Sequence, residues 1–253
     1  MSPASDCTAA DGTASTLAHL GRCLLLVPHP DDETIACGGL LCLLACAGLP
    51  VKLLLLSDGA GSHPNSRAFP PARLRDVRLQ EMQAALHVLG HVSQHLDTLN
   101  LPDGAVPLPG EAGFGAALDA LTHAVAAFGP DTVFMPVADD GHRDHRATHA
   151  LGQGACARAA PRALLLGYAV WLGAGVDERP QSRRDIAADG HLPWVLDIRS
   201  VLPQKLRALA CHQSQLGLLV HDDPTGFVLP AQLRARCAQG HESFVHLKPT
   251  TAP

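Results

Sequence analysis

Val27-Pro28-His29-Pro30-Asp31-Asp32-Glu33 directly follows an apolar run at residues 23–26. A short aliphatic run that ends abruptly in a histidine and three acids predicts a buried strand whose carboxyl end carries chemistry. Three adjacent carboxylates repel one another, so the cluster is destabilising unless a positive charge lies among them, and a divalent cation supplies one. His29 and Asp32 are ligands of the kind that zinc accepts, which leaves Asp31 available for proton transfer.

A second polar cluster follows a second strand-like run. Residues 132–137 are apolar and β-like, and residues 139–145 read Asp-Asp-Gly-His-Arg-Asp-His. If the two runs are neighbours in one parallel sheet, their carboxyl ends face the same crevice, and His145 completes a set of His, Asp and His ligands. Three protein ligands with an open fourth position are typical of a catalytic rather than a structural zinc site.

These motifs together resemble those of the LmbE-like, PIG-L-type de-N-acetylases. The segments that carry the resemblance are Pro28–Glu33, Gly38-Gly39, Arg78–Glu81, Leu89-Gly90, Leu101–Gly104, His142–His145 and His212–Gln215. The resemblance runs from about Arg22 to about Phe244. It implies a zinc hydrolase that removes acetyl groups from N-acetylglucosamine-containing small molecules or glycolipids.

The resemblance also implies roles for individual residues. Asp31 corresponds to the aspartate that accepts a proton from water. His142 takes the position of the donor to the oxyanion and the departing amine, as an imidazolium whose ring Asp144 holds. Arg78 is expected to contact the substrate or a carboxylate of the first motif, and His212 to contact the substrate.

The pattern of the whole chain predicts an α/β fold with a Rossmann-like, mostly parallel sheet, helices on both faces and a small C-terminal β/α extension. Strands are expected at about residues 22–27, 51–56, 95–99, 131–137, 163–170 and 194–198. Helices are expected at about residues 34–47, 73–89, 112–128, 146–157 and 200–219. Gly38 and Gly39 indicate close helix packing, because no Gly-x-Gly-x-x-Gly pattern is present.

The length favours a single large domain. A chain of 253 residues is long enough for one well-buried core. We expect a flexible leader at residues 1–20 and one de-N-acetylase domain at residues 21–248. The Gly- and Pro-rich loop at residues 57–71 follows a strand and is therefore expected at the rim of the site, and a polar insert at residues 173–192 separates the last two predicted strands.

Composition excludes several other classes of protein. The net charge of −5 offers no basic surface for nucleic acid. The longest apolar stretch, at residues 35–51, contains glycines and a proline and is too short for a membrane span. Residues 1–19 lack the basic start and apolar core of a secretory signal, which predicts a cytoplasmic protein. The expected partner is a small amino-sugar substrate, and no feature indicates the oligomeric state.

Three alternatives remain open at this stage. The same three ligands could hold iron(II) as a facial triad, although that chemistry usually occurs in an all-β fold. The chain could also be a zinc amidase for another N-acyl substrate, or a non-catalytic sugar-binding relative. The aglycone is not specified by any motif.

Overall fold

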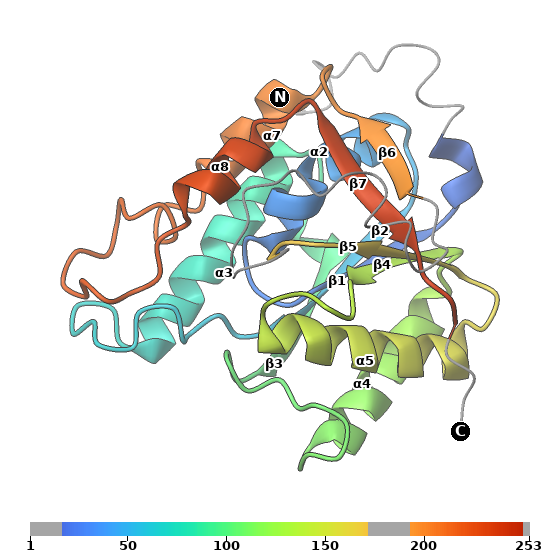
Figure 1. Ribbon diagram of the computed structural model, residues 1–253, viewed down its shortest axis with the longest axis horizontal. Coiled ribbons are helices and arrows are strands. Elements are labelled where there is room, and N and C mark those ends of the chain that lie inside the picture. The colour runs from blue at the N-terminus through green and yellow to red at the C-terminus, as the bar shows by residue number, and fades with distance from the viewer. Residues whose placement is uncertain (1–16, 172–192, 250–253) are drawn as a thin grey trace.

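The computed structural model in Figure 1 describes residues 17–171 and 193–249. Its centre is a seven-stranded sheet in the order β3-β2-β1-β4-β5-β7-β6. The strands are β1 (Cys23–Val27), β2 (Val51–Ser57), β3 (Leu96–Leu101), β4 (Thr132–Pro136), β5 (Leu164–Tyr168), β6 (Pro193–Asp197) and β7 (His241–His246). The first five are parallel to one another, whereas β7 pairs antiparallel with both β5 and β6. The predicted α/β fold class is confirmed.

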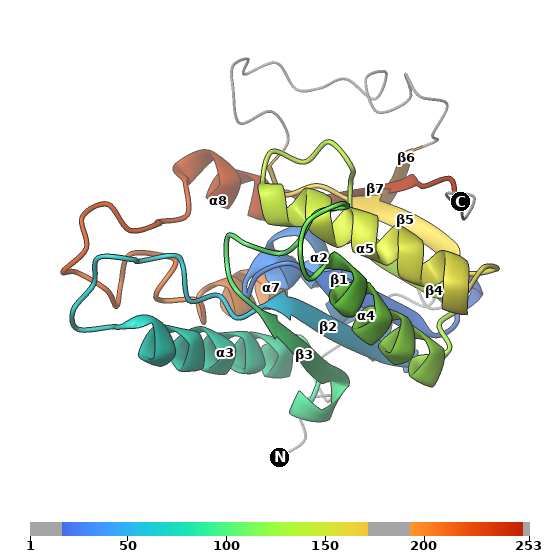
Figure 2. The ribbon, with the colours of Figure 1, turned by 90° about the horizontal axis from the view of Figure 1, so that it is seen from below.

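Helices cover both faces of this sheet. They are α2 (Asp32–Cys46), α3 (Pro71–Val88), α4 (Phe114–Phe128), α5 (Arg143–Ala159), α7 (Leu202–Leu209) and α8 (Ala231–Cys237), with short 3-10 turns at η2 (Ala18–Leu20) and η3 (Ser93–His95). Figures 1 and 2 show α4 and α5 together on one face and α2, α3 and α7 on the other. The molecule therefore has three layers, with the sheet in the middle.

The aliphatic run of β1 contributes side chains to the hydrophobic cores on both faces of the sheet, because successive side chains of a strand point to opposite faces. Leu25 and Val27 belong to the core beneath α2, α3 and α7. Leu24 and Leu26 belong to the core beneath α4 and α5. A strand covered on both faces has no polar side to show, which explains why β1 reads as a continuous apolar run.

The strand order places a switch point between β1 and β4. From β1 the chain proceeds to β2 and β3 on one side, whereas β4 lies on the other side of β1 and continues to β5. Loops leave the carboxyl ends of β1 and β4 in opposite directions at such a point, so a crevice opens between them. Both polar motifs follow these two strand ends, as the sequence predicts.

Two loops far apart in the sequence are joined at the edge of the molecule, side by side in Figures 1 and 2. The Asp222 carboxylate accepts hydrogen bonds from the Ser66 hydroxyl at 2.6 Å and from the Arg67 and Ala68 amides at 2.8 and 2.9 Å. The Asp223 carboxylate accepts one from the Asn65 amide at 2.8 Å. The loop predicted at residues 57–71 is thus tied to residues 222–223.

Three expectations need correction. The helix predicted at residues 200–219 is wrong beyond its first half, since α7 ends at Leu209. Strand β7 and helix α8 were not predicted. The end of the predicted flexible leader packs into the core, where Leu17 and Leu20 are fully buried. Residues 1–16 of that leader and all of the 173–192 insert lie outside the described residues.

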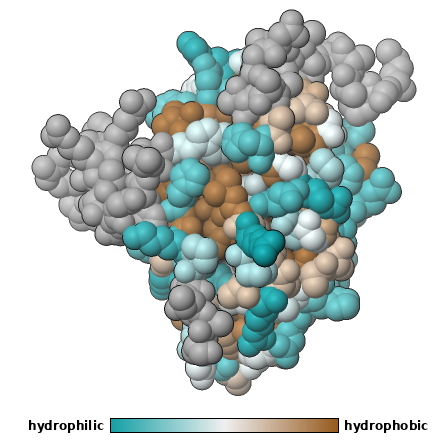
Figure 3. Space-filling model, turned by 90° about the vertical axis from the view of Figure 1, so that its right-hand side faces the viewer, coloured by the Kyte–Doolittle hydropathy of each residue, from teal (hydrophilic) through white to brown (hydrophobic). Residues whose placement is uncertain are grey.

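The remaining surface carries few large apolar side chains. On the side away from the two joined loops, Figure 3 shows an apolar area bordered by hydrophilic side chains. Scattered apolar surface is usual in folded proteins, and no site is assigned there. Within residues 17–171 and 193–249, no helix combines the length and apolarity needed to cross a bilayer.

Candidate active site

The first motif turns sharply between β1 and α2. Asp31 has φ 141°, a conformation that side chains other than glycine rarely adopt. Its amide donates to Glu33 Oε2 at 3.0 Å, and the amides of Thr34 and Ile35 donate to its carbonyl at 3.0 and 2.9 Å. Backbone strain of this kind costs about 1–3 kcal/mol and is concentrated at functional sites. The turn brings His29, Asp31 and Asp32 into one buried cluster.

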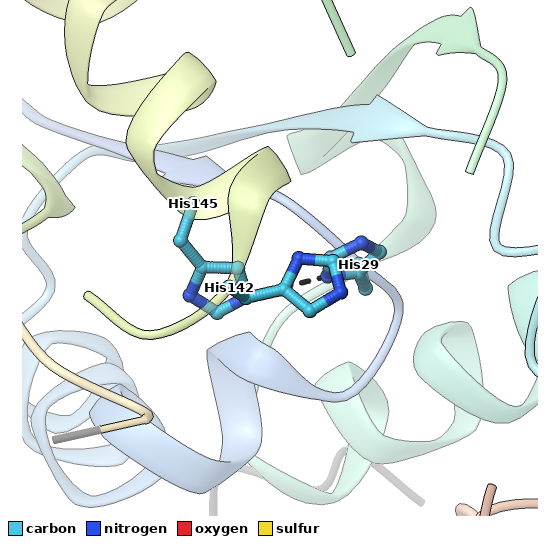
Figure 4. Close-up of side chains that lie close together, drawn as sticks. All are labelled: His29, His142 and His145. Atoms are coloured by element: carbon cyan, nitrogen blue, oxygen red, sulfur yellow. Dashed lines mark hydrogen bonds between the residues drawn. The ribbon is translucent and has the colours of Figure 1, made fainter. Parts of the chain in front are cut away.

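Three predicted ligand atoms form a small triangle. His29 Nδ1 lies 3.2 Å from Asp32 Oδ2, His145 Nε2 lies 3.1 Å from the same oxygen, and the two nitrogens are 3.3 Å apart. Figure 4 shows the rings of His29, His142 and His145 turned toward one another, with His145 extending from the first turn of α5. All three triangle residues are buried.

This triangle fits a tetrahedral zinc ion. Donor atoms about 2.0–2.1 Å from zinc in tetrahedral geometry lie about 3.3 Å from one another, close to the distances found here. The sets His29, His142, His145 and His29, Asp103, Asp144 also bring ligand atoms close enough for one ion. The triangle is preferred for two reasons. The distances between its donor atoms match those of a tetrahedral site, and His29 can bind the ion through Nδ1 while its Nε2 faces the carboxylates of Asp103 and Asp144.

The outer nitrogens of both histidines face carboxylates. His29 Nε2 lies 3.1 Å from Asp144 Oδ2 and 3.2 Å from Asp103 Oδ1. His145 Nδ1 lies 3.3 Å from Asp140 Oδ1, without hydrogen-bond alignment. Carboxylates in this position orient metal-binding histidines and make them more basic. Burial lowers the pKa of both rings, but the neighbouring carboxylates outweigh it. Asp103, Asp144 and Asp32 raise the pKa of His29. Asp32, followed by Asp140, raises the pKa of His145 to about 9, so a bound cation competes with protons at both rings.

Asp31 lies beside the triangle and is held by an arginine. Arg78 Nη2 is 3.5 Å from Asp31 Oδ2 and donates to the Pro30 carbonyl at 2.9 Å, while Nη1 donates to the Gly59 carbonyl at 2.8 Å. Burial raises the pKa of Asp31 to about 7, even though Arg78 acts in the opposite direction. Arg78 thus contacts a carboxylate of the first motif, and its role toward a substrate stays a prediction.

The predicted pairing of Asp144 with the His142 ring is wrong. The Asp144 carboxylate binds His29 and accepts the Gly104 and Val106 amides at 2.7 and 3.2 Å. His142 instead caps α5, with Nδ1 accepting the Asp144 amide at 3.1 Å. Burial, followed by the neighbouring His29 and His145, lowers the pKa of His142. When Nδ1 accepts this amide, the ring proton of His142 lies on Nε2, and the role of His142 as a donor to the substrate stays a prediction.

His212 is also placed differently from the prediction. It is 1% exposed, and its Nε2 lies 3.2 Å from both Glu33 Oε1 and Thr34 Oγ1. It lies behind the first motif and does not line the pocket. Its contact with Glu33 supports the turn, and Gln215, three residues further on, is the member of this segment that reaches the pocket.

Sequence reasoning missed Asp103, Asp140 and Gln215. Asp103 joins His29 to Arg78, whose Nη1 lies 3.4 Å from Asp103 Oδ2. Its turn follows the carboxyl end of β3, and that position at the same edge as the two motifs was the available signal. For Gln215 the available signal was its place in His212–Gln215, a segment that carries the family resemblance.

A pocket of about 460 Å³ opens over these residues. Its polar lining includes His29, Asp31, Arg78, Asp103, His142 and Gln215, and its apolar lining is Ile35, Trp171, Phe227 and Leu229. The volume lies in the usual range for small-molecule sites, and a mixed lining of this kind is typical of them. The loop predicted at the rim contributes Gly61, Ser62 and Pro64.

Comparison with known proteins identifies relatives of this chain by sequence and by fold. The chain is 32% identical over 222 residues to 2'-N-acetylparomamine deacetylase of Streptomyces fradiae, covering 81% of this chain and 77% of that protein. It is 30% identical over 241 residues to 1D-myo-inositol 2-acetamido-2-deoxy-alpha-D-glucopyranoside deacetylase of Rhodococcus erythropolis, covering 77% and 81%. The fold matches N,N'-diacetylchitobiose deacetylase from Pyrococcus horikoshii with a TM-score of 0.61 at 19% identity, over 91% of this chain and 84% of that one.

A family model adds the final comparison. Residues 24–156, which contain both polar motifs, match the model described as PIG-L, GlcNAc-PI de-N-acetylase. With the two relatives at 30% identity or more, this match shows that the chain belongs to the PIG-L family of hydrolytic N-deacetylases.

Proposed function

We propose that this protein is a zinc-dependent de-N-acetylase that acts on a small molecule containing N-acetylglucosamine. The triangle of His29, Asp32 and His145, beside Asp31 in a pocket of about 460 Å³, carries the proposal. The relatives named above deacetylate acetamido sugars, which supports the same substrate class for this chain. The aglycone is left open, because the relatives differ in it.

Zinc held by these three residues would lower the pKa of water to about 7 and polarise the substrate carbonyl. The chain's own groups supply the proton transfers. Asp31 takes a proton from the attacking water as the water oxygen bonds to the carbonyl carbon of the substrate. When the C–N bond breaks, a proton returns to the nitrogen, and the products are acetate and a free amine.

The other residues act by orientation and hydrogen bonding. Arg78 fixes Asp31 through a contact of 3.5 Å and through the Pro30 carbonyl. His142 directs an Nε2 proton toward the pocket, since its Nδ1 is occupied by the Asp144 amide. A preorganised donor there stabilises the negative charge that develops on the carbonyl oxygen.

Two substitutions separate proton transfer from metal binding. Asp31→Asn is expected to keep zinc and to lose activity by a factor of about 10²–10⁴, because the base is lost. Asparagine tolerates a positive φ, so the turn is expected to persist. Asp32→Ala is expected to lose zinc itself. Metal content and acetate release are measured for both variants.

The substrate class is tested by acetate release from zinc-loaded protein. The panel contains N-acetylglucosamine, N,N'-diacetylchitobiose, an N-acetylglucosaminyl inositol and an acetylated paromamine, with Asp31→Asn as control. Release from at least one compound, absent in the control, supports the proposal. Silence on the whole panel from zinc-bound protein would refute the substrate class, and full activity of Asp31→Asn would refute its role as the base.

A further inference from the structure

Gln215 is buried, yet half of its amide has no partner. The residue is 1% exposed and lines the same pocket as His29 and Asp31. Its Oε1 accepts no hydrogen bond from any described residue. An unsatisfied buried acceptor costs about 1–3 kcal/mol, so its presence in a binding pocket indicates a donor that arrives with the ligand.

The amide orientation follows from a chain of hydrogen bonds. Ser214 donates its single hydroxyl proton to Glu81 Oε2 at 2.6 Å, and its amide donates to Glu81 Oε1 at 2.8 Å. Ser214 Oγ can therefore only accept, which it does from Gln215 Nε2 at 2.9 Å. The Nε2 group also lies 3.2 Å from Ser62 Oγ. Both amide protons are used, and the free atom is the oxygen.

The backbone of Gln215 is held as firmly as its side chain. The Leu229 amide donates to the Gln215 carbonyl at 2.7 Å, and the Phe227 amide donates to the Ser62 carbonyl at 2.7 Å. Phe227 and Leu229 line the pocket as well. The acceptor is thus fixed in place before a ligand binds, and a fixed acceptor discriminates between ligands that do and do not bring a donor.

We propose that Gln215 Oε1 accepts a hydrogen bond from one hydroxyl group of the bound amino sugar and that Gln215 is a specificity-determining residue. The inference rests on the proposed function and adds to it a requirement on the sugar ring. A sugar lacking that hydroxyl leaves Oε1 unsatisfied in the complex, whereas a sugar bearing it completes the network that begins at Glu81.

The test measures equilibrium binding and not only turnover. Dissociation constants are determined by calorimetry for N-acetylglucosamine and its 3-, 4- and 6-deoxy analogues. All proteins are zinc-loaded and carry Asp31→Asn, which is expected to prevent hydrolysis during the titration, and they are otherwise wild type, Gln215→Met or Gln213→Met. Methionine keeps the length of glutamine without its acceptor, and Gln213 is the exposed neighbour that serves as control. Wild type is expected to bind one deoxy analogue about five- to tenfold more weakly than the parent sugar.

For Gln215→Met, the parent sugar is expected to bind about five- to tenfold more weakly than to wild type, and the discrimination against that analogue is expected to disappear. Gln213→Met should match wild type. Equal loss for all four sugars, or binding unchanged from the control, would show that Gln215 has a purely structural role. If Gln215→Met does not fold, wild type alone decides, because discrimination below twofold for every deoxy analogue overturns the inference.

Acetate release, measured in parallel on the same proteins with Asp31 intact, separates this inference from the proposed function. Binding with the Gln215 signature but without acetate would refute deacetylation and leave the contact standing. Acetate release with Gln215→Met equal to Gln213→Met would leave deacetylation standing and refute the contact. Failure of wild type to bind any of the sugars would overturn the inference.

Discussion

At the scale of residues, the site is organised by buried carboxylates that hold histidines. Asp140 is the most connected of those that sequence reasoning missed. Its Oδ1 accepts the His142 amide at 3.0 Å and lies 3.3 Å from His145 Nδ1. Its Oδ2 accepts the Val170 and Trp171 amides at 3.0 and 3.1 Å. Asp140 therefore links a proposed metal ligand to the loop that brings Trp171 to the pocket.

Replacing Asp140 by Asn is expected to weaken zinc binding by about 10- to 100-fold, because the substitution removes the negative charge beside His145 and turns an amide group toward backbone donors. Zinc affinity is measured by competition with a chromophoric chelator. Asp139→Asn is the matched control, since Asp139 is the exposed preceding residue. Equal affinities for the two variants would exclude this role of Asp140.

At the scale of elements, helix α2 carries site residues at its first turn, and Glu242 of β7 binds its backbone near the middle. The Gly39 and Leu40 amides donate to Glu242 Oε1 and Oε2 at 2.7 and 2.8 Å. Glu242 forms an ion pair with the buried Lys205, whose Nζ lies 2.7 Å from Glu242 Oε1. A Cβ on Gly39 would lie 2.5 Å from Ile198 Cγ2, so glycine is required for this close approach. The expectation of close packing at Gly38 and Gly39 is confirmed.

Gly39→Ala is expected to lower the free energy of unfolding by about 1–3 kcal/mol through overpacking against Ile198. Gly115→Ala is the control, because Gly115 is exposed on α4 and a Cβ there meets nothing within 4 Å. The control is expected to be neutral or to stabilise by up to about 1 kcal/mol, as alanine favours helix. Urea denaturation measures both, and a Gly39→Ala variant as stable as the control would contradict the packing argument.

Predictions from the local sequence pattern were wrong or missing where tertiary contacts decide the structure, as in residues 210–219 and in β7. Residues 210–219 have no helix breaker before Gly217, yet the Ser214 amide donates to Glu81 and Gly217 adopts φ 72°. In β7, the inward-facing positions include Glu242, which pairs with Lys205. An acid at a buried position hides the alternation by which a strand is usually recognised.

At the scale of the whole molecule, buried His91 is expected to make folding sensitive to acid. The ring is 2% exposed, and its Nε2 lies 2.9 Å from the Leu41 carbonyl, which joins the end of α3 to α2. His95 Nδ1 lies 3.4 Å from His91 Nδ1. Burial lowers the pKa of His91 from 6.5 to about 4.

The unfolded chain therefore binds a proton at His91 between about pH 6.5 and pH 4 that the folded chain does not bind. Stability is expected to fall with decreasing pH over this interval, by up to about 1.4 kcal/mol per pH unit from this residue. His91→Gln should reduce the difference in unfolding free energy between pH 7 and pH 5, measured by urea denaturation. His87→Gln, at an exposed position of α3, is the control, and the same pH dependence in both variants would exclude His91 as the source.

The sequence by itself determined the family, the α/β class and the proposed metal ligands. It could do so because each of these depends on short local patterns: an apolar run that ends in His29, Asp31 and Asp32, and a second run that precedes His145. Strand ends in a parallel sheet meet at one edge, so local patterns were enough to bring the two motifs together.

Only the tertiary structure decided what each of these groups contacts. Asp144 faces His29 and not the neighbouring His142, and His212 lies behind Glu33. The hydrogen bonds from Glu81 through Ser214 leave Oε1 of Gln215 buried without a partner among the described residues. These pairings join residues separated by as many as 179 positions in the chain, from Glu33 to His212. Their geometry depends on how layers pack and which polar groups remain to be satisfied after burial, and neither is encoded in the spacing of residues along the chain.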